Sequence, residues 1–362
     1  MTEPLSGLEF QSELGRGSMG QVVLARQLPS GRLVAVKRLC ETGALSTTQQ
    51  GRLRREAKAL ARLDDPHVVR LLQLLEVGDE LLLILEYIDG PSLAQLLEQG
   101  PIREADAMAV LEQVQGALSH AHRLGVLHRD VKASNVIISQ QGICKLTDFG
   151  LARLDDIAGN AARTLLTRPG TPLGTAPYMS PEAVSGDADL DERSDIYSLG
   201  VLAYELLVGR LPFPPERGTT ALLNAHLSEP VPRPSALVPG FPPGVEEALL
   251  GALEKDRGQR IPTAPALWDL LEEAAARAWP AWREDADLVA VAALGRSARR
   301  PSASAGETDH SLESLGLAQL ERIRPTFPDL GPERRGVRWV RWGLVGLAAA
   351  LAVTLLIQAA LR

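Results

Sequence analysis

Cysteine is scarce in this chain: its 362 residues include two, Cys40 and Cys144, which lie far apart. Two separated cysteines in apolar or strand-like settings are typical of reduced thiols, so we expect a reducing compartment and no disulfide framework. An excess of positive charge is also missing, because 38 basic and 45 acidic residues give a net charge of −7. This composition gives no reason to expect nucleic acid as a partner.

The N-terminus lacks a continuous apolar run. Its first ten residues, MTEPLSGLEF, include an acidic side chain, which indicates that there is no signal peptide. Near the other end, residues 342–361 read WGLVGLAAALAVTLLIQAAL, 20 residues without a charge. A helix of that length spans about 30 Å, the thickness of the bilayer hydrocarbon. We predict a transmembrane helix at 342–361; the alternative is a buried hairpin helix of a globular domain.

The charges around this run predict its orientation. Four arginines precede it, at positions 334, 335, 338 and 341, and Arg362 follows it. The positive-inside rule then places the N-terminal part in the cytoplasm, with a single-pass C-terminal anchor in the cytoplasmic membrane and the lipid bilayer as a partner. Small residues at Gly346 and Ala350 could permit close contact between two such helices, so a homodimer is a further expectation.

Strand-like and helix-like patterns alternate along the first three quarters of the chain. Residues 21–39 and 68–87 favour pairs of strands, and residues 51–63, 104–125 and 195–209 have helical periodicity. A small β-rich unit followed by a larger helical unit is the predicted architecture. The predicted divisions are an N-terminal extension at 1–9, a folded domain at 10–271, a partly disordered linker at 272–341, and the apolar helix.

The stretch 13-ELGRGSMGQVVLARQ-27 carries three glycines at G-x-G-x-x-G spacing, Gly15, Gly17 and Gly20. This spacing suits the pyrophosphate of a dinucleotide or the phosphates of ATP. A dinucleotide site requires a helix after the glycines and an acidic residue about 20 positions on. Here a β-favouring run, Gln21 to Leu24, follows the glycines, and Lys37 stands about 20 positions on. The context therefore favours a glycine-rich hairpin that covers the triphosphate of ATP, and not a dinucleotide site.

Two further motifs carry chemical groups suited to phosphoryl transfer. The run 128-HRDVKASN-135 contains a carboxylate at Asp130, a cation at Lys132 and an amide at Asn135, and 148-DFG-150 follows 13 residues later. Carboxylate and amide oxygens are ligands that Mg²⁺ prefers. A carboxylate can also accept or orient the proton of a hydroxyl group.

These motifs together resemble the eukaryotic-type (Hanks-type) serine/threonine protein kinases, in their bacterial membrane-anchored form. The resemblance runs from about Phe10 to Leu271. It implies an α+β, two-lobed protein kinase fold, with a small β-rich N-lobe at about 10–88 and a larger helical C-lobe at about 89–271. It also implies ATP and Mg²⁺ as cofactors, with Mn²⁺ as a possible substitute, and protein substrates with Ser or Thr acceptors.

The resemblance assigns roles to individual residues. It implies that Asn135 and Asp148 are the metal ligands and that Asp130 accepts or orients the proton of the substrate hydroxyl. Asp130, Lys132, Lys37 and Glu56 are the expected catalytic residues, with Lys37 on a strand paired to Glu56 on the next helix. Leu85 would guard the pocket behind the adenine, beside the connection between the lobes. The residues expected to bind ATP are Leu14, Gly15, Arg16, Gly17, Ser18, Met19, Gly20, Gln21, Val22, Ala35, Lys37, Leu85, Glu86, Ile88, Asn135 and Asp148.

The segment from Asp148 to Glu182 resembles a kinase activation segment and ends in GTAPYMSPE, with Ser180 where the family has alanine. Glu182 is expected to pair with Arg260, and Asp195 to support the backbone of the catalytic loop. Arg129 would gather a phosphorylated activation segment. The candidate autophosphorylation sites are Thr164, Thr167 and Thr171.

Two other function classes are alternatives to an active protein kinase. A pseudokinase that serves as a docking or scaffold module would lack an equivalent of Lys37, Asp130 or Asp148, and all three are present. A small-molecule phosphotransferase on a related fold would lack the G-T-x-x-Y-M-x-P-E ending, which is also present. The sequence therefore favours an active protein kinase over both.

Overall fold

The computed structural model describes residues 7–17, 20–39, 47–77, 80–149, 176–187 and 189–298, which belong to one compact unit. Several predictions concern residues outside these ranges: Ser18 and Met19 of the glycine-rich loop, the three candidate phosphorylation sites, the linker from 299 on, and the helix at 342–361. Within the described ranges, no helix is both long and apolar enough to cross a membrane.

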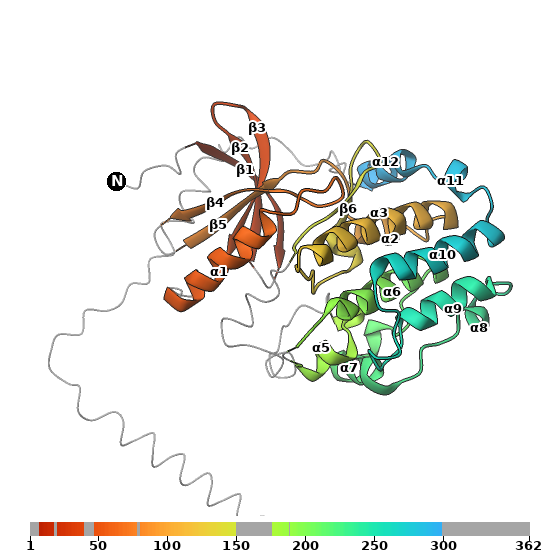
Figure 1. Ribbon diagram of the computed structural model, residues 1–362. Coiled ribbons are helices and arrows are strands. Elements are labelled where there is room, and N and C mark those ends of the chain that lie inside the picture. Colours follow the sequence, from red (N-terminus) through yellow and green to blue (C-terminus); the bar gives the residue numbers. More distant parts are fainter. Residues whose placement is uncertain are drawn as a thin grey trace, which may run out of the picture. The chain divides into compact units, whose positions relative to one another are not determined.

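The N-lobe contains a five-stranded antiparallel sheet and one long helix (Figure 1). The strands lie in the order β1-β2-β3-β5-β4, and helix α1 contacts β4. The bounds are β1 Leu8–Gly17, β2 Gly20–Gln27, β3 Arg32–Leu39, α1 Thr47–Leu60, β4 Leu71–Val77 and β5 Glu80–Glu86. The β-rich first unit predicted from the sequence is confirmed.

Alternation along β3 and β5 divides the sheet into two faces. Val34 and Val36 point to one face, where they form an apolar cluster with Leu82 and Ile84 of β5. Since successive side chains of a strand point in opposite directions, Ala35 and Lys37 point to the other face. The register pairs Ala35 with Leu85, so a second row of side chains faces the helical lobe.

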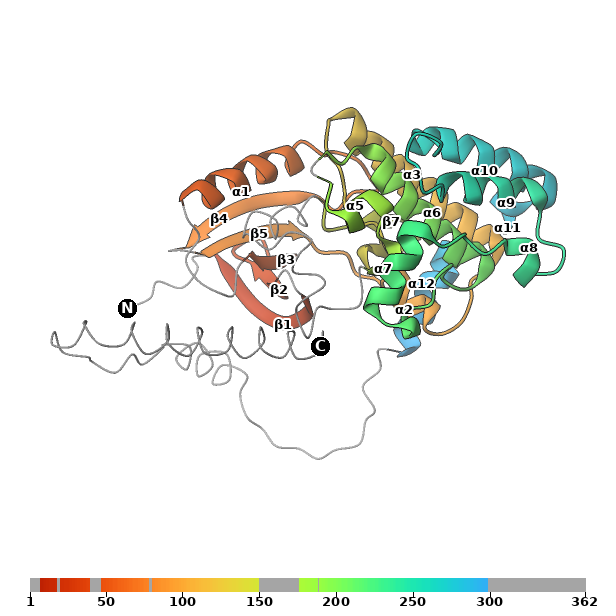
Figure 2. The same cartoon turned by 90° about the horizontal axis from the view of Figure 1, so that it is seen from below.

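The C-lobe is helical and is built around α3 and α6 (Figures 1 and 2). Both helices contribute mostly buried side chains to the large core of the unit, and α3 also contacts α10 and α11. The helices are α2 Leu93–Leu97, α3 Glu104–Arg123, α5 Pro181–Ser185, α6 Glu192–Val208, α7 Thr219–Ser228, α8 Pro234–Leu237, α9 Pro243–Ala252, α10 Ala264–Ala278, α11 Trp282–Asp285 and α12 Leu288–Ala298.

A short hairpin between α3 and α6 brings two motifs together. Strand β6 (Val136–Ile138) pairs with β7 (Cys144–Leu146), and Val136 lies opposite Leu146. The pairing continues beyond the strands, because the N–H of Thr147 donates to the carbonyl of Asn135 at 2.9 Å. Asn135, from the first motif, and Asp148, from the second, therefore lie at the same end of this hairpin.

The folded unit continues past residue 271, into the segment that was predicted to be a partly disordered linker. Helix α10 continues to Ala278, and α11 and α12 follow it within the same compact unit. Trp282, Leu288, Val291 and Ala292 are buried in the main core of the C-lobe. Residues 288–294, LVAVAAL, form a short continuous apolar run, so the sequence shows no alternation with polar residues that would indicate a helix with one buried face. In the structure these helices cover core residues that would otherwise face water. The linker prediction is thereby corrected for residues 272–298.

Candidate active site

The glycine-rich stretch forms a hairpin. Strands β1 and β2 pair antiparallel, with Gly15 opposite Val22 and Gly17 opposite Gly20. A dinucleotide site needs the glycines to open a helix, and a strand stands there instead. The hairpin therefore excludes the dinucleotide alternative and agrees with the phosphate lid that the sequence favoured.

A cavity of about 270 Å³ lies below this hairpin, between the sheet and the helical lobe. Its size is near the lower end of small-molecule sites, which occupy roughly 300–1,000 Å³. The predicted ATP-binding residues that line it are Leu14, Gly15, Val22, Ala35, Leu85, Glu86, Ile88 and Asp148. The sequence prediction missed Val69, Tyr87, Gly90, Ser92, Gln95, Ser134, Ile137 and Thr147, which also line it.

Other predicted ATP-binding residues lie beside the cavity or outside the described part of the chain. Gln21 donates a side-chain hydrogen bond to Glu13 and is not among the lining residues. Arg16, Gly17 and Gly20 belong to the paired strands, and the Arg16 side chain lies outside the described part of the chain. Lys37 and Asn135 do not line the cavity themselves; each contacts a residue of the catalytic motifs instead.

Lys37 forms an ion pair with Asp148. The distance from Nζ to Oδ1 is 2.8 Å, and the Lys37 side chain is only 4% exposed. The pair joins the N-lobe sheet to the end of the β6–β7 hairpin, so the lysine and the predicted metal ligand meet at one edge of the cavity. Glu56, the predicted partner of Lys37, belongs to α1, but its side chain lies outside the described residues.

This ion pair keeps Asp148 ionised. Burial by itself would raise the pKa of the Asp148 carboxyl, but the adjacent Lys37 ammonium more than offsets burial, and the pKa is lowered. A carboxylate that stays charged at neutral pH can serve as a ligand for a hard cation. The protonation state of Asp148 thus agrees with its predicted role.

The two carboxylate oxygens of Asp130 have different surroundings. Oδ2 accepts from Lys132 Nζ at 2.7 Å and from Asn135 Nδ2 at 3.0 Å. Oδ1 is buried and has no hydrogen-bond partner among the described residues. A buried acceptor without a partner costs free energy, and such atoms are found where a ligand supplies the missing bond. Oδ1 is therefore the atom at which a substrate hydroxyl can bind.

Asn135 is oriented by the same loop. Its Nδ2 donates to the Asp130 carbonyl at 2.8 Å as well as to the Asp130 carboxylate. With the amide nitrogen used as a donor, the amide oxygen is the atom that remains to accept from a ligand or to bind a cation.

His128 joins the catalytic loop to the β6–β7 hairpin by hydrogen bonds. The sequence did not predict this role, although His128 belongs to the HRDVKASN motif. Its Nδ1 accepts from the Asp130 N–H at 3.1 Å, and its Nε2 donates to the Thr147 carbonyl at 2.8 Å. These two bonds require the neutral ring with its hydrogen on Nε2. Burial lowers the pKa of His128, which stabilises that neutral form. The His128 ring also packs on Phe149, with ring centroids 4.4 Å apart.

Two non-glycine residues of the site have left-handed backbones, Arg129 with φ 67° and Asp148 with φ 66°. This conformation costs on the order of 1–2 kcal/mol per residue and persists where surrounding contacts hold it. Asp195 supplies such contacts, because its carboxylate accepts from the backbone N–H groups of His128 at 2.8 Å and Arg129 at 2.7 Å. The predicted support of the catalytic loop by Asp195 is confirmed.

Asp195 itself is held in its ionised form. Burial acts to raise the pKa of its carboxyl, but hydrogen bonding to His122 and to the loop more than offsets burial, and the pKa is lowered. His122 Nε2 lies 2.8 Å from Asp195 Oδ2, the oxygen that also accepts from the His128 N–H. A buried, charged group of helix α6 thus stabilises the strained loop. Asp195 is not the N-cap of α6, because Asp191 occupies that position.

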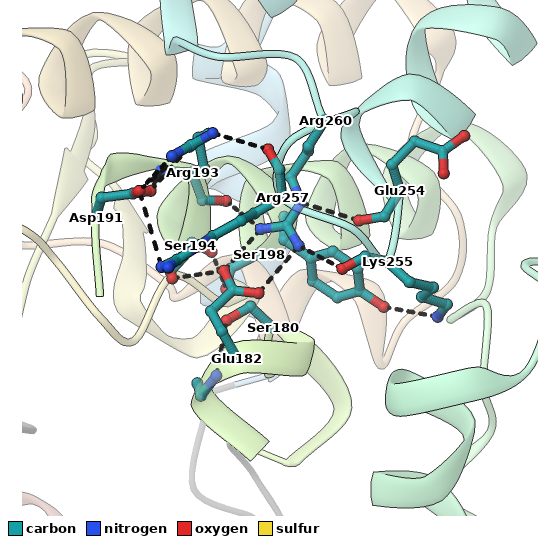
Figure 3. A network of polar contacts seen from close by, with 12 residues as sticks. Ser180, Glu182, Asp191, Arg193, Ser194, Ser198, Glu254, Lys255, Arg257 and Arg260 are labelled. Carbon is teal, nitrogen blue, oxygen red and sulfur yellow. Dashed lines mark hydrogen bonds and ion pairs between the residues drawn. The ribbon is translucent and has the colours of Figure 1, made fainter. Parts of the chain in front are cut away.

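The end of the activation segment is fixed by a buried ion pair (Figure 3). Glu182 of α5 accepts two hydrogen bonds from Arg260, at 2.7 and 3.0 Å, and a third from the Ser194 hydroxyl at 2.6 Å. The predicted pairing of Glu182 with Arg260 is confirmed. Ser180, where the family has alanine, caps α5 by accepting from the N–H of Ala183 at 3.3 Å.

The donors of the site fit a nucleotide with Mg²⁺. No cluster of three or more His, Cys, Asp or Glu side chains that could hold a metal ion by itself occurs in the described part of the chain. Mg²⁺ does not require one, since it commonly binds through one or two protein oxygens together with substrate phosphates and waters. Asp148 and Asn135 would hold it here.

Comparison with known proteins gives a consistent result. Residues 8–267 match the family model of the protein kinase domain. The chain is 37% identical over 280 residues to the probable serine/threonine-protein kinase PknB of Bifidobacterium longum. The match covers 73% of this chain and 39% of PknB. It is 39% identical over 265 residues to the serine/threonine-protein kinase PknL of Mycobacterium tuberculosis. That match covers 72% of this chain and 64% of PknL.

A solved structure has the same fold. The crystal structure of the PknI kinase domain of M. tuberculosis superposes with a TM-score of 0.58 and 27% identity, and covers 75% of this chain and 96% of that domain. The chain spans about two fifths of the length of PknB and 64% of that of PknL. With the family model matching most of its length and the loop geometry above, the chain belongs to the protein kinase family, in its Hanks-type serine/threonine class.

Proposed function

We propose that this protein is a serine/threonine protein kinase that transfers the γ-phosphoryl group of ATP to Ser or Thr hydroxyls of protein substrates. The observation that carries the proposal is the asymmetric environment of Asp130. Lys132 and Asn135 hold one carboxylate oxygen, while the other is buried and has no partner within the described residues. A scaffold protein gains nothing from such an arrangement, whereas a hydroxyl acceptor would complete it.

The residues divide the reaction between them. Asp130 Oδ1 accepts the hydrogen of the substrate hydroxyl and aims its oxygen at the phosphoryl group. Lys132, held 2.7 Å from Asp130, places a positive charge beside the migrating phosphoryl group. Lys37 supplies a second positive charge toward the phosphates from the N-lobe side. When bound, Mg²⁺ would neutralise the charge that develops on the phosphate oxygens.

The test compares the full chain with its Asp130→Asn variant, using labelled ATP, Mg²⁺ and a mixed Ser/Thr protein substrate. We expect the variant to lose transfer by about 10²- to 10⁴-fold, because the amide cannot take the proton. Nucleotide binding, measured with a fluorescent ATP analogue, should be retained, because Asp130 does not line the cavity. Equal transfer by both proteins would contradict the proposal, and nucleotide binding without transfer by either would favour the scaffold alternative.

We extend the proposal to autophosphorylation and to membrane-anchored signalling. Arg129 stands directly before Asp130, and the candidate acceptors Thr164, Thr167 and Thr171 lie between the two ends of the activation segment. The uncharged run at 342–361 with its preceding arginines supports an anchor in the cytoplasmic membrane and a possible homodimer. Mass spectrometry of the wild-type chain after incubation with ATP would show which threonine acquires phosphate.

A further inference from the structure

Helices α11 and α12 lie beyond residue 267, where the match to the kinase family model ends. Helix α11 packs on α3, whereas α12 also contacts two segments of the C-lobe that border the nucleotide cavity. Helix α12 contacts α2 and α3, as Figure 1 shows at the edge of the helical lobe. The contacts of α12 are tight enough to transmit a displacement, because they are made by glycines with no room for a side chain.

The first contact joins α12 to the connection between the lobes. A Cβ placed on Gly295 would lie 2.4 Å from Cβ and 2.6 Å from Cγ of Pro91. Pro91 cannot yield easily, because its carbonyl accepts from the Ile138 N–H of β6 at 3.0 Å. Its sequence neighbours, Gly90 and Ser92, both line the cavity. Gly295 thus contacts the outer side of a segment whose inner side faces the nucleotide site.

The second contact joins the start of α12 to the turn of the β6–β7 hairpin. Gly142 in this turn has φ +76°, and a Cβ on it would lie 3.2 Å from both the Val289 side chain and the Val289 nitrogen. The opposite end of the same hairpin carries Asn135 and Asp148. One helix therefore contacts both the connection between the lobes and the hairpin that presents the predicted metal ligands.

Polar contacts hold α12 in this position. The buried carboxylate of Asp106 on α3 accepts from the Asp287 N–H at 2.8 Å and from Arg103 at 2.7 and 2.9 Å. Arg103 also donates to the Asp285 carbonyl at 3.0 Å. Asp287 in turn caps α12, because its side chain accepts from the Ala290 N–H at 2.9 Å. Charge-assisted hydrogen bonds hold the first turn of the helix. Close contacts of Gly295 with Pro91, and of Val289 with Gly142, hold the rest.

We infer that α12 positions the nucleotide site from outside, and that Gly295 is a positioning residue whose missing side chain lets Pro91, and through it Gly90 and Ser92, reach their binding geometry. This inference rests on the proposed function, since it concerns the affinity for ATP. A side chain at position 295 must displace either α12 or Pro91, because a Cβ to carbon distance under 3.0 Å is not tolerated.

The experiment uses the full chain with three single substitutions, Gly295→Ala, Gly295→Leu and Ala293→Leu. Ala293 is exposed on the same helix and is the matched control. We expect Gly295→Leu to raise the Kd for a fluorescent ATP analogue with Mg²⁺, and the KM for ATP, by about three- to tenfold, with kcat changed by less than about twofold. Gly295→Ala should show a smaller rise, although alanine favours a helix, and Ala293→Leu should show none.

A second measurement covers the case in which Gly295→Leu does not fold. Because coupling between two sites is reciprocal, the ATP analogue should slow hydrogen exchange of the α12 amides in the wild-type chain. A wild-type chain that binds no analogue would overturn the proposed function and this inference with it. A wild-type chain that binds it, with unchanged exchange in α12 or with unchanged Kd in a folded Gly295→Leu variant, would overturn the inference alone.

Discussion

At the scale of single residues, His226 on α7 shows how burial sets the charge of a side chain. The residue is fully buried, and its Nδ1 lies 3.0 Å from the Tyr197 hydroxyl, which accepts from Lys255 Nζ at 3.1 Å. The rings of Tyr197 and Phe213 contact it edge-on. Burial, and then the positive charge of Lys255, lowers the pKa of His226 to about 3. The folded protein therefore keeps this ring neutral in mild acid.

A pH dependence of stability follows from this pKa. In the unfolded chain a histidine has a pKa of about 6.5, so between pH 6.5 and pH 3 the unfolded state binds a proton that the folded state does not. The free energy of unfolding should fall as the pH is lowered through this window. Between pH 7 and pH 4, wild type should lose on the order of 3 kcal/mol more than the non-titrating variant His226→Gln.

Urea unfolding of both proteins at several pH values between 7 and 4 measures this difference. The other acid-sensitive groups are common to both proteins and cancel in the comparison. Parallel curves for wild type and His226→Gln over the whole window would show that His226 titrates normally in the folded state.

At the scale of secondary-structure elements, the short helix α11 is the clearest departure from the sequence prediction. Trp282 is 3% exposed and packs edge-on against Trp268 of α10, with ring centroids 6.0 Å apart. The Arg283 guanidinium lies over the Trp282 ring at 4.3 Å and forms an ion pair with Glu112 of α3. Such contacts belong to a packed helix of the C-lobe and not to a linker.

The substitution Trp282→Ala tests the packing of α11. It should lower the free energy of unfolding by about 3–5 kcal/mol, the usual cost of removing a large buried aromatic side chain. Leu270→Ala, which truncates an exposed side chain of α10, is the control and should change it by less than about 0.5 kcal/mol. Denaturant unfolding measures both free energies. A Trp282→Ala variant as stable as the control would show that α11 does not contribute to the packed core of the C-lobe.

At the scale of the whole molecule, the proposed membrane anchor links the kinase unit to a bilayer. The full chain should sediment with membranes, and a chain that stops before Trp342 should stay in the supernatant, because it lacks the uncharged run of 20 residues. Nucleotide binding by both chains would show that the kinase unit is intact in each. Equal sedimentation of the two would refute the anchor.

Much of the site could be predicted because it depends on short-range patterns. Alternation along β2 and β3 places Val22, Ala35 and Lys37 on one face, and the hairpin follows from the β-favouring run after the glycines. Val69 and Thr147 were missed because loops bring them to the cavity, and Ser134 because it lies in a single 3-10 turn; neither kind of segment has a period that the sequence could reveal. The prediction of a linker at 272–298 was wrong because the burial of α12 depends on a surface formed by distant segments.

The sequence by itself determined which chemical groups this protein carries and in what order, since the glycine spacing, the catalytic motif and the DFG motif are local. Only the tertiary structure decided which atoms meet. It paired Lys37 with Asp148, seated the loop backbone on Asp195, and left one oxygen of Asp130 without a partner. Those outcomes depend on contacts between residues far apart in the chain, and such contacts form only when the sheet, the hairpin and the helices pack together.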